Sequence, residues 1–105
     1  MSKSISIYSQ ETTIAASGTL ELTDDFLHEC ELVKLSVLSG SGTCKLEATP
    51  REKGGGDASA VDSIATGLTS GSYDTYIYSG ANKFTVTETG GANSITVLLK
   101  AYRIA

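Results

Sequence analysis

Short segments in which polar and apolar residues alternate recur along the whole chain, separated by glycine, serine and asparagine. Strict alternation puts successive side chains on opposite faces of an extended strand, so these segments are typical of half-buried β-strands. Their short spacing, with turn residues between them, favours a sandwich or barrel. The expected strands are Lys3–Ser9, Thr13–Ala16, Thr19–Thr23, Leu32–Ser39, Thr43–Thr49, Ala60–Ala65, Tyr73–Ser79, Lys83–Thr89 and Ser94–Ile104.

A turn at Gly40–Ser41 predicts a hairpin between two of these strands. A two-residue loop pairs Val37 with Cys44 on an apolar face, and it places Lys34 opposite Glu47 on a polar face. A shift of one residue would destroy this match, so the alternation supports this register. The sequence therefore predicts that the two strands pair side by side.

Gly90–Gly91 predicts a second hairpin, because two glycines suit the positive φ angles of a type I′ turn. This loop pairs Val86 with Ile95 on the apolar face. Together with the preceding strand, it predicts a three-strand meander over Tyr73–Ile104.

Two further segments complete the expected architecture. Thr23–Glu29 has the composition of one short helical turn, with Thr23 or Asp24 as its N-cap. Residues 50–59 are charged and then glycine-rich, which predicts a long exposed loop within a single domain over residues 1–105. The expected fold is an all-β, antiparallel β-sandwich, jelly-roll-like, with about eight strands.

Composition and charge narrow the classes of partner. The 105 residues carry a net charge of −4, from 12 acidic and 8 basic residues. The basic residues form no stripe, which argues against a nucleic-acid partner. The sequence shows neither a basic amphipathic helix nor an apolar run of about 20 residues, so we expect no membrane partner. The first residues lack the apolar core of a secretion signal, so we expect synthesis in the cytoplasm.

Of the two cysteines, Cys30 and Cys44, the first lies next but one to the only histidine, His28. In the predicted hairpin Cys44 lies opposite Val37, about 23 Å along the strand from Cys30, whereas a disulfide needs Cα atoms within about 7 Å. We therefore expect free thiols, with Cys44 packed as a small apolar residue. His28 and Cys30 would share a strand face, but no cysteine-hydrolase signature surrounds them, so a surface histidine beside a structural cysteine is the preferred interpretation.

Candidate metal ligands are equally sparse. The cysteines and the histidine supply three ligands at most, in separated places, which argues against zinc. No EF-hand spacing occurs, so solvated loop acids rather than calcium ligands are expected at Asp24, Asp25, Asp57, Asp62 and Asp74. We expect no cofactor and no catalytic site, and predict that the chain is not an enzyme.

Tyrosines and a partly apolar last strand give the candidate interface. Tyr73, Tyr76 and Tyr78 gather on one expected strand, where core packing, a protein interface and stacking on sugar rings all stay open. Leu98 and Tyr102 fall on the outer face of the last strand, which is a liability for a free monomer if that strand is an edge. Cover from another subunit or from the N-terminal strand is therefore expected.

The segment Gly80–Tyr102 contains Thr-Glu-Thr-Gly-Gly, followed by alternating Ser/Thr and aliphatic residues. It resembles the closing hairpin of small β-sandwich virion proteins of tailed bacteriophages, which include head-decoration, head-fibre and tail modules. The resemblance covers about a quarter of the chain. It implies a structural protein that binds a capsid or tail lattice, often as a homotrimer, and it assigns no site residue.

These observations together predict a non-enzymatic structural protein of a phage virion, as capsid decoration or a head or tail accessory. Such a protein would act by protein–protein assembly, as a homo-oligomer, with a trimer favoured, and with other virion proteins. Its location would be the virion, assembled in the host cytoplasm. The alternative is a carbohydrate-binding β-sandwich module that uses its surface tyrosines, with a glycan as its partner.

Overall fold

The computed structural model describes residues 4–104, and the burial of side chains over residues 8–103. Within this range the chain forms eight strands and one 3-10 helix, η1 (Leu27–Glu29), between the second and third strands. The strands are β1 (Ser4–Ile14), β2 (Thr19–Thr23), β3 (Leu32–Gly40), β4 (Cys44–Pro50), β5 (Asp62–Leu68), β6 (Tyr73–Ile77), β7 (Ala81–Glu88) and β8 (Ile95–Ile104).

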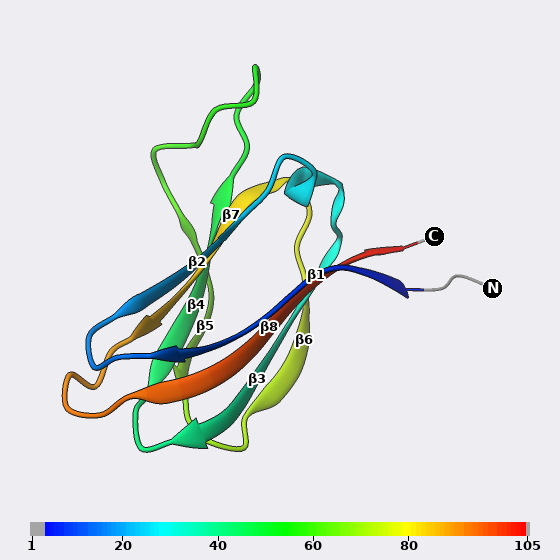
Figure 1. Cartoon of the computed structure of the whole chain (residues 1–105). Coiled ribbons are helices and arrows are strands. Elements are labelled where there is room, and N and C mark those ends of the chain that lie inside the picture. Colours follow the sequence, from blue (N-terminus) through cyan, green and yellow to red (C-terminus); the bar gives the residue numbers. More distant parts are fainter. Residues whose placement is uncertain (1–3, 105) are drawn as a thin grey trace.

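The strands form two antiparallel four-stranded sheets, with the orders β1-β8-β3-β6 and β2-β7-β4-β5 (Figure 1). Only β4 and β5 are consecutive strands that pair within one sheet, and every other connection leads from one sheet to the other. Eight strands in two sheets with this order make a jelly roll. The predicted all-β, antiparallel, jelly-roll-like sandwich of about eight strands is confirmed.

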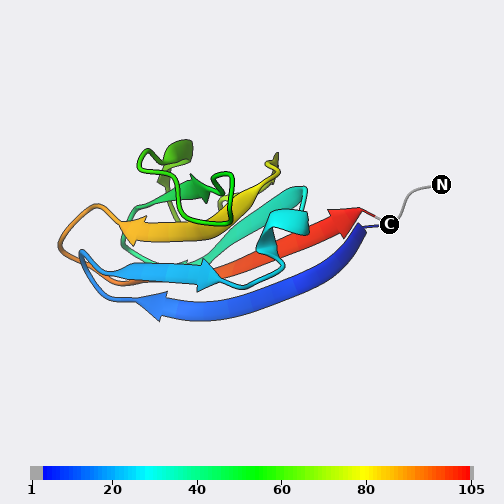
Figure 2. The ribbon, with the colours of Figure 1, turned by 90° about the horizontal axis from the view of Figure 1, so that it is seen from above.

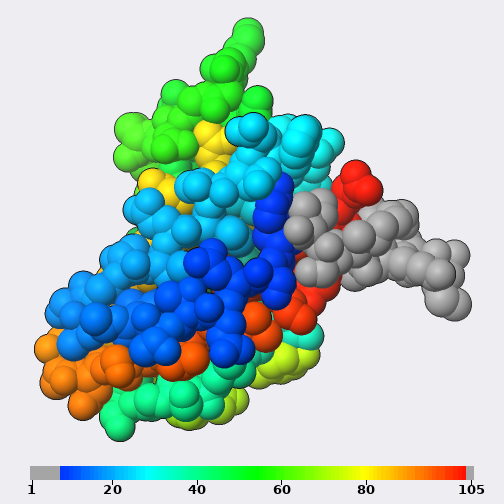
Figure 3. Space-filling model, in the orientation of Figure 1, coloured from blue at the N-terminus to red at the C-terminus, as the bar shows by residue number. Residues whose placement is uncertain are grey.

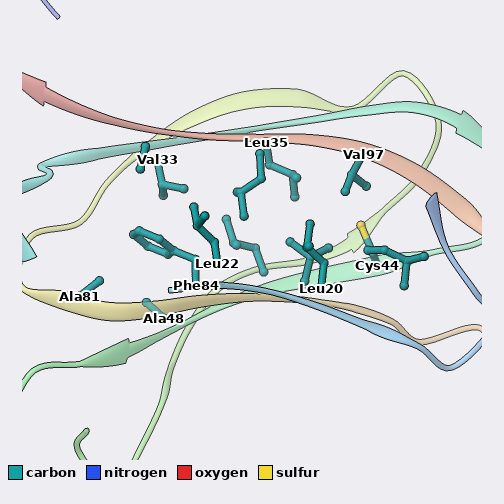
Figure 4. Packing of buried hydrophobic residues seen from close by; sticks show 14 of the residues in the cluster. Leu20, Leu22, Val33, Leu35, Cys44, Ala48, Ala81, Phe84 and Val97 are labelled. Atoms are coloured by element: carbon teal, nitrogen blue, oxygen red, sulfur yellow. The ribbon is translucent and has the colours of Figure 1, made fainter. Parts of the chain in front are cut away.

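The core lies between the two sheets. On β3, for example, Val33, Leu35 and Val37 are buried, and the residues between them point to the outer face. Burial of one such side chain stabilises the fold by about 1.5–3 kcal/mol. Figure 4 shows side chains of both sheets meeting in this layer: Leu20, Leu22 and Phe84 from one sheet, and Val33, Leu35 and Val97 from the other.

The turn at Gly40–Ser41 leads from one sheet to the other, so the predicted hairpin of β3 with β4 is wrong. Val37 pairs with Val97 of β8, and Cys44 pairs with Glu88 of β7. Both Val37 and Cys44 are nevertheless buried, as the alternation indicates. Alternation fixes the inward face of each strand, but it is the same for strands that pair side by side and for strands that face each other across a core.

Gly90–Gly91 also joins strands of different sheets, so the predicted pairing of Val86 with Ile95 and the meander over Tyr73–Ile104 are wrong. Val86 instead pairs with Leu20 of β2. Strand β8 lies inside its sheet, between β1 and β3, and is not an edge strand. The N-terminal strand therefore lies beside β8 as its hydrogen-bonded neighbour, and its described residues do not lie across the outer face of β8.

One buried carboxylate joins three turns at one end of the sandwich. Glu88 is 1% exposed, and its Oε1 accepts hydrogen bonds from the backbone N–H groups of Ser17 (3.0 Å) and Gly91 (2.8 Å). Its Oε2 accepts from those of Thr43 (2.9 Å) and Gly90 (2.8 Å). These groups belong to the β1–β2, β3–β4 and β7–β8 turns, the first and last of which lie side by side in Figures 1 and 2. These hydrogen bonds, of which the one from Ser17 has the largest effect, lower the pKa of Glu88 to about 2.

Residues 51–61 leave the sandwich between β4 and β5 as a loop that stands out from the body of the molecule (Figures 1 and 3). Most of its side chains are exposed, as expected for residues 50–59. An isolated bridge joins Arg51 to Asp57. Asn82 of β7 donates hydrogen bonds from its Nδ2 to the Gly55 carbonyl (3.0 Å) and to Asp57 Oδ1 (2.9 Å), which fixes the loop to the sheet.

The helical turn predicted over Thr23–Glu29 is shorter than expected and has a different cap. Only Leu27–Glu29 is helical, Phe26 is the N-cap residue, and no side chain caps the turn. Asp24 instead accepts a hydrogen bond from the Phe26 N–H through its Oδ1 (3.2 Å). Within residues 4–104 no helix has the length and apolar character needed to cross a membrane.

Candidate functional site

The outer faces of the two sheets differ in chemistry. On the β2-β7-β4-β5 sheet, threonines alternate with charged side chains that form ion pairs. Lys45 Nζ lies 3.5 Å from Glu47 Oε1, and Lys83 Nζ lies 3.9 Å from Glu21 Oε1. Such a face suits contact with water, because its charges are balanced locally.

The outer face of the other sheet combines apolar, aromatic and unbalanced basic side chains. Residues directly opposite in adjacent strands point to the same side of a sheet, so the register places these side chains in rows across β6, β3 and β8. We call this surface the lysine–tyrosine face. Its residues are Leu32, Lys34, Ser36, Tyr73, Thr75, Ile77, Leu98, Lys100 and Tyr102.

A row of Tyr73, Ser36 and Leu98 runs across the three strands on one side of the lysines. The Lys34 ammonium lies 4.4 Å from the centroid of the Tyr73 ring, a cation–π distance. A side-chain hydrogen bond with Tyr73 is the main cause that raises the pKa of Lys34. Lys34, Ser36, Tyr73, Leu98 and Lys100 together line a hollow of about 70 Å³.

A second row lies on the other side of the lysines. Leu32 pairs with Ile77 of β6 and with Tyr102 of β8. The Ile77 side chain, at the end of the edge strand β6, is 86% exposed. A second hollow, of about 180 Å³, lies here and is lined by Leu32, Lys34, Thr75 and Tyr102.

The structure brings three of the five predicted interface residues together. Tyr73 is 63% exposed, and Leu98 and Tyr102 are half-buried, all on the lysine–tyrosine face. Sequence reasoning missed the basic pair Lys34 and Lys100 because it placed Lys34 opposite Glu47. The alternation already put both lysines on outer positions, but only the β3–β8 register shows that they are opposite each other.

Tyr76 and Tyr78 point to the other side, toward the core, and are not part of this face. Both are half-buried and pack against the core cluster. The Tyr78 ring meets Phe84 edge to face at a centroid distance of 5.9 Å, and its hydroxyl donates to Asp62 Oδ2 (2.7 Å). Burial first, and then the bond to Asp62, raise the pKa of Tyr78 to about 12. Burial also raises the pKa of Tyr76.

A polar cleft of about 670 Å³ lies between the end of β2 and the 51–61 loop. Asp24, Asp25 and Asp57, which the sequence offered as loop acids, line it together with Arg51. A hydrogen bond with Tyr8 is the main cause that lowers the pKa of Asp24. Across residues 4–104 no group of three histidine, cysteine or acidic side chains is arranged to hold a metal ion.

The cysteines and the histidine are separated by their environments. Cys30 and Cys44 are free thiols, 1% and 0% exposed, and burial raises the pKa of both, that of Cys44 to about 11. His28 lies in η1, and its Nδ1 is 2.7 Å from Nη1 of Arg51. Cys30 is therefore a buried structural cysteine, and His28, two residues before it, makes its contact with Arg51 nearer the surface.

No protein-family model and no curated protein matches the sequence. A chain of the Bacillus endospore appendages, which form disulfide-linked pili, is similar in structure at a TM-score of 0.52 and 15% identity, covering 98% of this chain and 86% of that chain.

The SPBc2 prophage-derived protein YomS is similar at a TM-score of 0.54 and 12% identity, covering 97% of this chain and 93% of that chain. A chain of the infectious bursal disease virus Gx strain aligns at a TM-score of 0.41 and 14% identity, over all of this chain and 36% of that one. At these identities the endospore appendage and YomS share the sandwich fold with this chain.

Proposed function

We propose that this chain is a non-enzymatic structural protein of a phage virion, either capsid decoration or a head or tail accessory. It acts by protein–protein assembly through the lysine–tyrosine face. The observation that carries the proposal is a pair of rows, Leu32, Ile77 and Tyr102 on one side of the lysines and Tyr73 and Leu98 on the other. They lie on an outer face that no part of residues 4–104 covers. Aromatic and aliphatic side chains gathered on one surface are typical of protein interfaces.

Two proteins of similar fold support the proposed class of function, that of a structural protein. YomS is a prophage-derived protein, and the endospore appendages are pili, so the same sandwich occurs in a phage-derived protein and in an extended protein assembly. Disulfide linkage through Cys30 or Cys44 is not part of the proposal, because both thiols are buried. A homotrimer stays a prediction that light scattering on the purified protein measures directly.

The carbohydrate alternative requires a platform of exposed tyrosines. Tyr76 and Tyr78 pack inward, so Tyr73 is the member of the tyrosine group that stands exposed on the outer face. A single ring that also carries the Lys34 ammonium offers little flat surface for a sugar. The assembly function is therefore preferred.

The test is incorporation into particles of the phage or prophage whose genome encodes the chain. Particles purified on a density gradient are expected to contain the chain at a fixed copy number, measured by quantitative mass spectrometry. A deletion strain is complemented with the gene for the wild type, for Leu98→Lys, or for Thr85→Lys, and particles are purified from each. Thr85→Lys is a control on the outer face of the opposite sheet.

The wild type and Thr85→Lys are expected to be incorporated equally, whereas Leu98→Lys is lost from particles although its circular dichroism and melting transition stay native-like. Absence of the wild-type chain from purified particles contradicts the virion assignment. Equal incorporation of all three proteins contradicts the use of this face.

A further inference from the structure

Two lysines occupy directly opposite positions of adjacent strands in the middle of the lysine–tyrosine face. Lys34 of β3 pairs in register with Lys100 of β8, both are half-buried, and strand β8 is flanked on both sides. Like charges at directly opposite positions destabilise a sheet. The ion pairs among the described residues join Lys45 to Glu47 and Lys83 to Glu21, so neither lysine of this face takes part in one.

The surroundings of the two lysines define what can cover them. Tyr73 and Leu98 lie on one side, and Leu32 and Tyr102 lie on the other. A partner that packs on these apolar groups removes water from the ammonium groups between them. Desolvated charges are costly unless opposite charges meet them, so the partner must supply carboxylates.

A second copy of the same face does not meet this requirement. A two-fold contact would bring four lysines together, since the same patch meets itself. Glu11 of β1, opposite Leu98, adds one carboxylate per copy among the described residues of this face. Two faces would therefore meet with an excess of positive charge.

We propose that the lysine–tyrosine face binds an acidic surface of a different protein, whose carboxylates meet Lys34 and Lys100 while its apolar groups cover Tyr73, Leu98 and Tyr102. The proposal rests on the assembly function above and names the chemistry of the partner. In the virion, that partner is a protein of the particle to which this chain attaches.

The experiment uses particles from the deletion strain, which lack this chain, and the purified wild-type protein added back. A water-soluble carbodiimide then condenses amines with the carboxylates that touch them, and it takes up the lost water to become a urea. Peptide mass spectrometry is expected to find amide cross-links from Lys34 or Lys100 to Asp or Glu of another particle protein. Cross-links from these lysines to a second copy of this chain, or none from them on protein that sediments with the particles, overturn the proposal.

Charge reversal separates this inference from the assembly function. Lys100→Glu is expected to weaken co-sedimentation with the particles about 30-fold or more, whereas Lys45→Glu, the same charge change on the opposite sheet, leaves it unchanged. Lys100→Glu also replaces a like-charge pair by an opposite-charge pair, so its melting temperature is expected to equal or exceed that of the wild type. Unchanged binding by Lys100→Glu overturns the acidic partner while leaving the assembly function intact, and wild-type protein that fails to sediment overturns both.

Discussion

Replacing Glu88 by glutamine tests how the three turns at one end of the sandwich are held. Each carboxylate oxygen accepts two backbone N–H groups at 2.8–3.0 Å. In Glu88→Gln an NH₂ donor stands where one of the oxygens was, so two of the four N–H groups lose their acceptor inside the protein. Buried donors without acceptors are costly, and the loss is greater here because the bonds run to a charged group.

The magnitude follows from the pKa of about 2, against an ordinary value of 4.5. This difference makes the binding of a proton to folded Glu88 roughly 300-fold weaker than to the unfolded chain. Because the pKa is lowered in the folded state, the stabilisation is present above pH 4.5 and disappears as the pH falls toward 2. Relative to neutral pH, the unfolding equilibrium constant of the wild type is therefore expected to rise through this group by roughly 150-fold at pH 2, and by up to roughly 300-fold only well below pH 2.

The assay is urea unfolding, followed by circular dichroism at pH values from 2 to 7, of the wild type, Glu88→Gln and the control Glu21→Gln. Glu21 is a partly exposed acid in a 3.9 Å ion pair with Lys83, so its replacement should change little. The difference in stability between wild type and Glu88→Gln should be constant above pH 5.5 and shrink below pH 4.5. A difference that stays constant down to pH 2 would refute the assignment of the stabilisation to the ionised carboxylate.

Three further measurements test other parts of the structure. Gly40→Ala is expected to lower the free energy of unfolding in urea by about 2–4 kcal/mol, because φ is +104° and a Cβ would lie 2.6 Å from a backbone oxygen. The control Gly67→Ala, where φ is +66° and the space is open, should cost about 1 kcal/mol. Equal costs would show that the clash is not the cause. Tyr78→Ala should lower stability by about 2–4 kcal/mol and Tyr73→Ala by less than about 0.5 kcal/mol, and the reverse order would place the wrong ring in the core. Both cysteine thiols should resist a disulfide reagent at pH 7 until the protein is unfolded, since burial holds the pKa of Cys44 at about 11; rapid labelling of native protein contradicts their burial.

Most strands could be predicted from the sequence because alternation and turn residues are local signals, although the expected strands Lys3–Ser9 and Thr13–Ala16 are replaced by the single strand β1. Thr19–Thr23 was predicted with the bounds that β2 has, and the inward side of β3 and β4 was assigned correctly. The partner of each strand could not be predicted this way. In a jelly roll the strand next in sequence usually crosses to the other sheet, so Val37 and Cys44 sit on facing layers and satisfy the same alternation as a hairpin.

For the candidate site, too, the direction of each side chain could be predicted from the sequence, but the pairing of the strands could not. The outward positions of Leu98 and Tyr102 depend only on parity along one strand, and they were predicted. The opposition of Lys34 and Lys100 depends on a pairing across more than sixty residues of sequence, which no local pattern contains. Glu88 shows a signal that was available but unused, since it continues the inward series of Phe84 and Val86 and precedes two glycines. An acid on an inward position is costly unless backbone donors surround it, and loop N–H groups are the nearest source.

The groups that hold the fold together and the proposed binding face lie in different parts of this molecule. The core between the sheets and the Glu88 carboxylate hold the fold together, and neither involves the outer side of the β1-β8-β3-β6 sheet. The lysine–tyrosine face, by contrast, carries an opposed pair of lysines and an 86% exposed isoleucine, features that favour a bound state over a free monomer. Substitutions on this face should therefore alter attachment without unfolding the domain. This separation makes the charge-reversal experiment interpretable, because a loss of binding in Lys100→Glu cannot be attributed to a loss of folded protein when its melting temperature is retained.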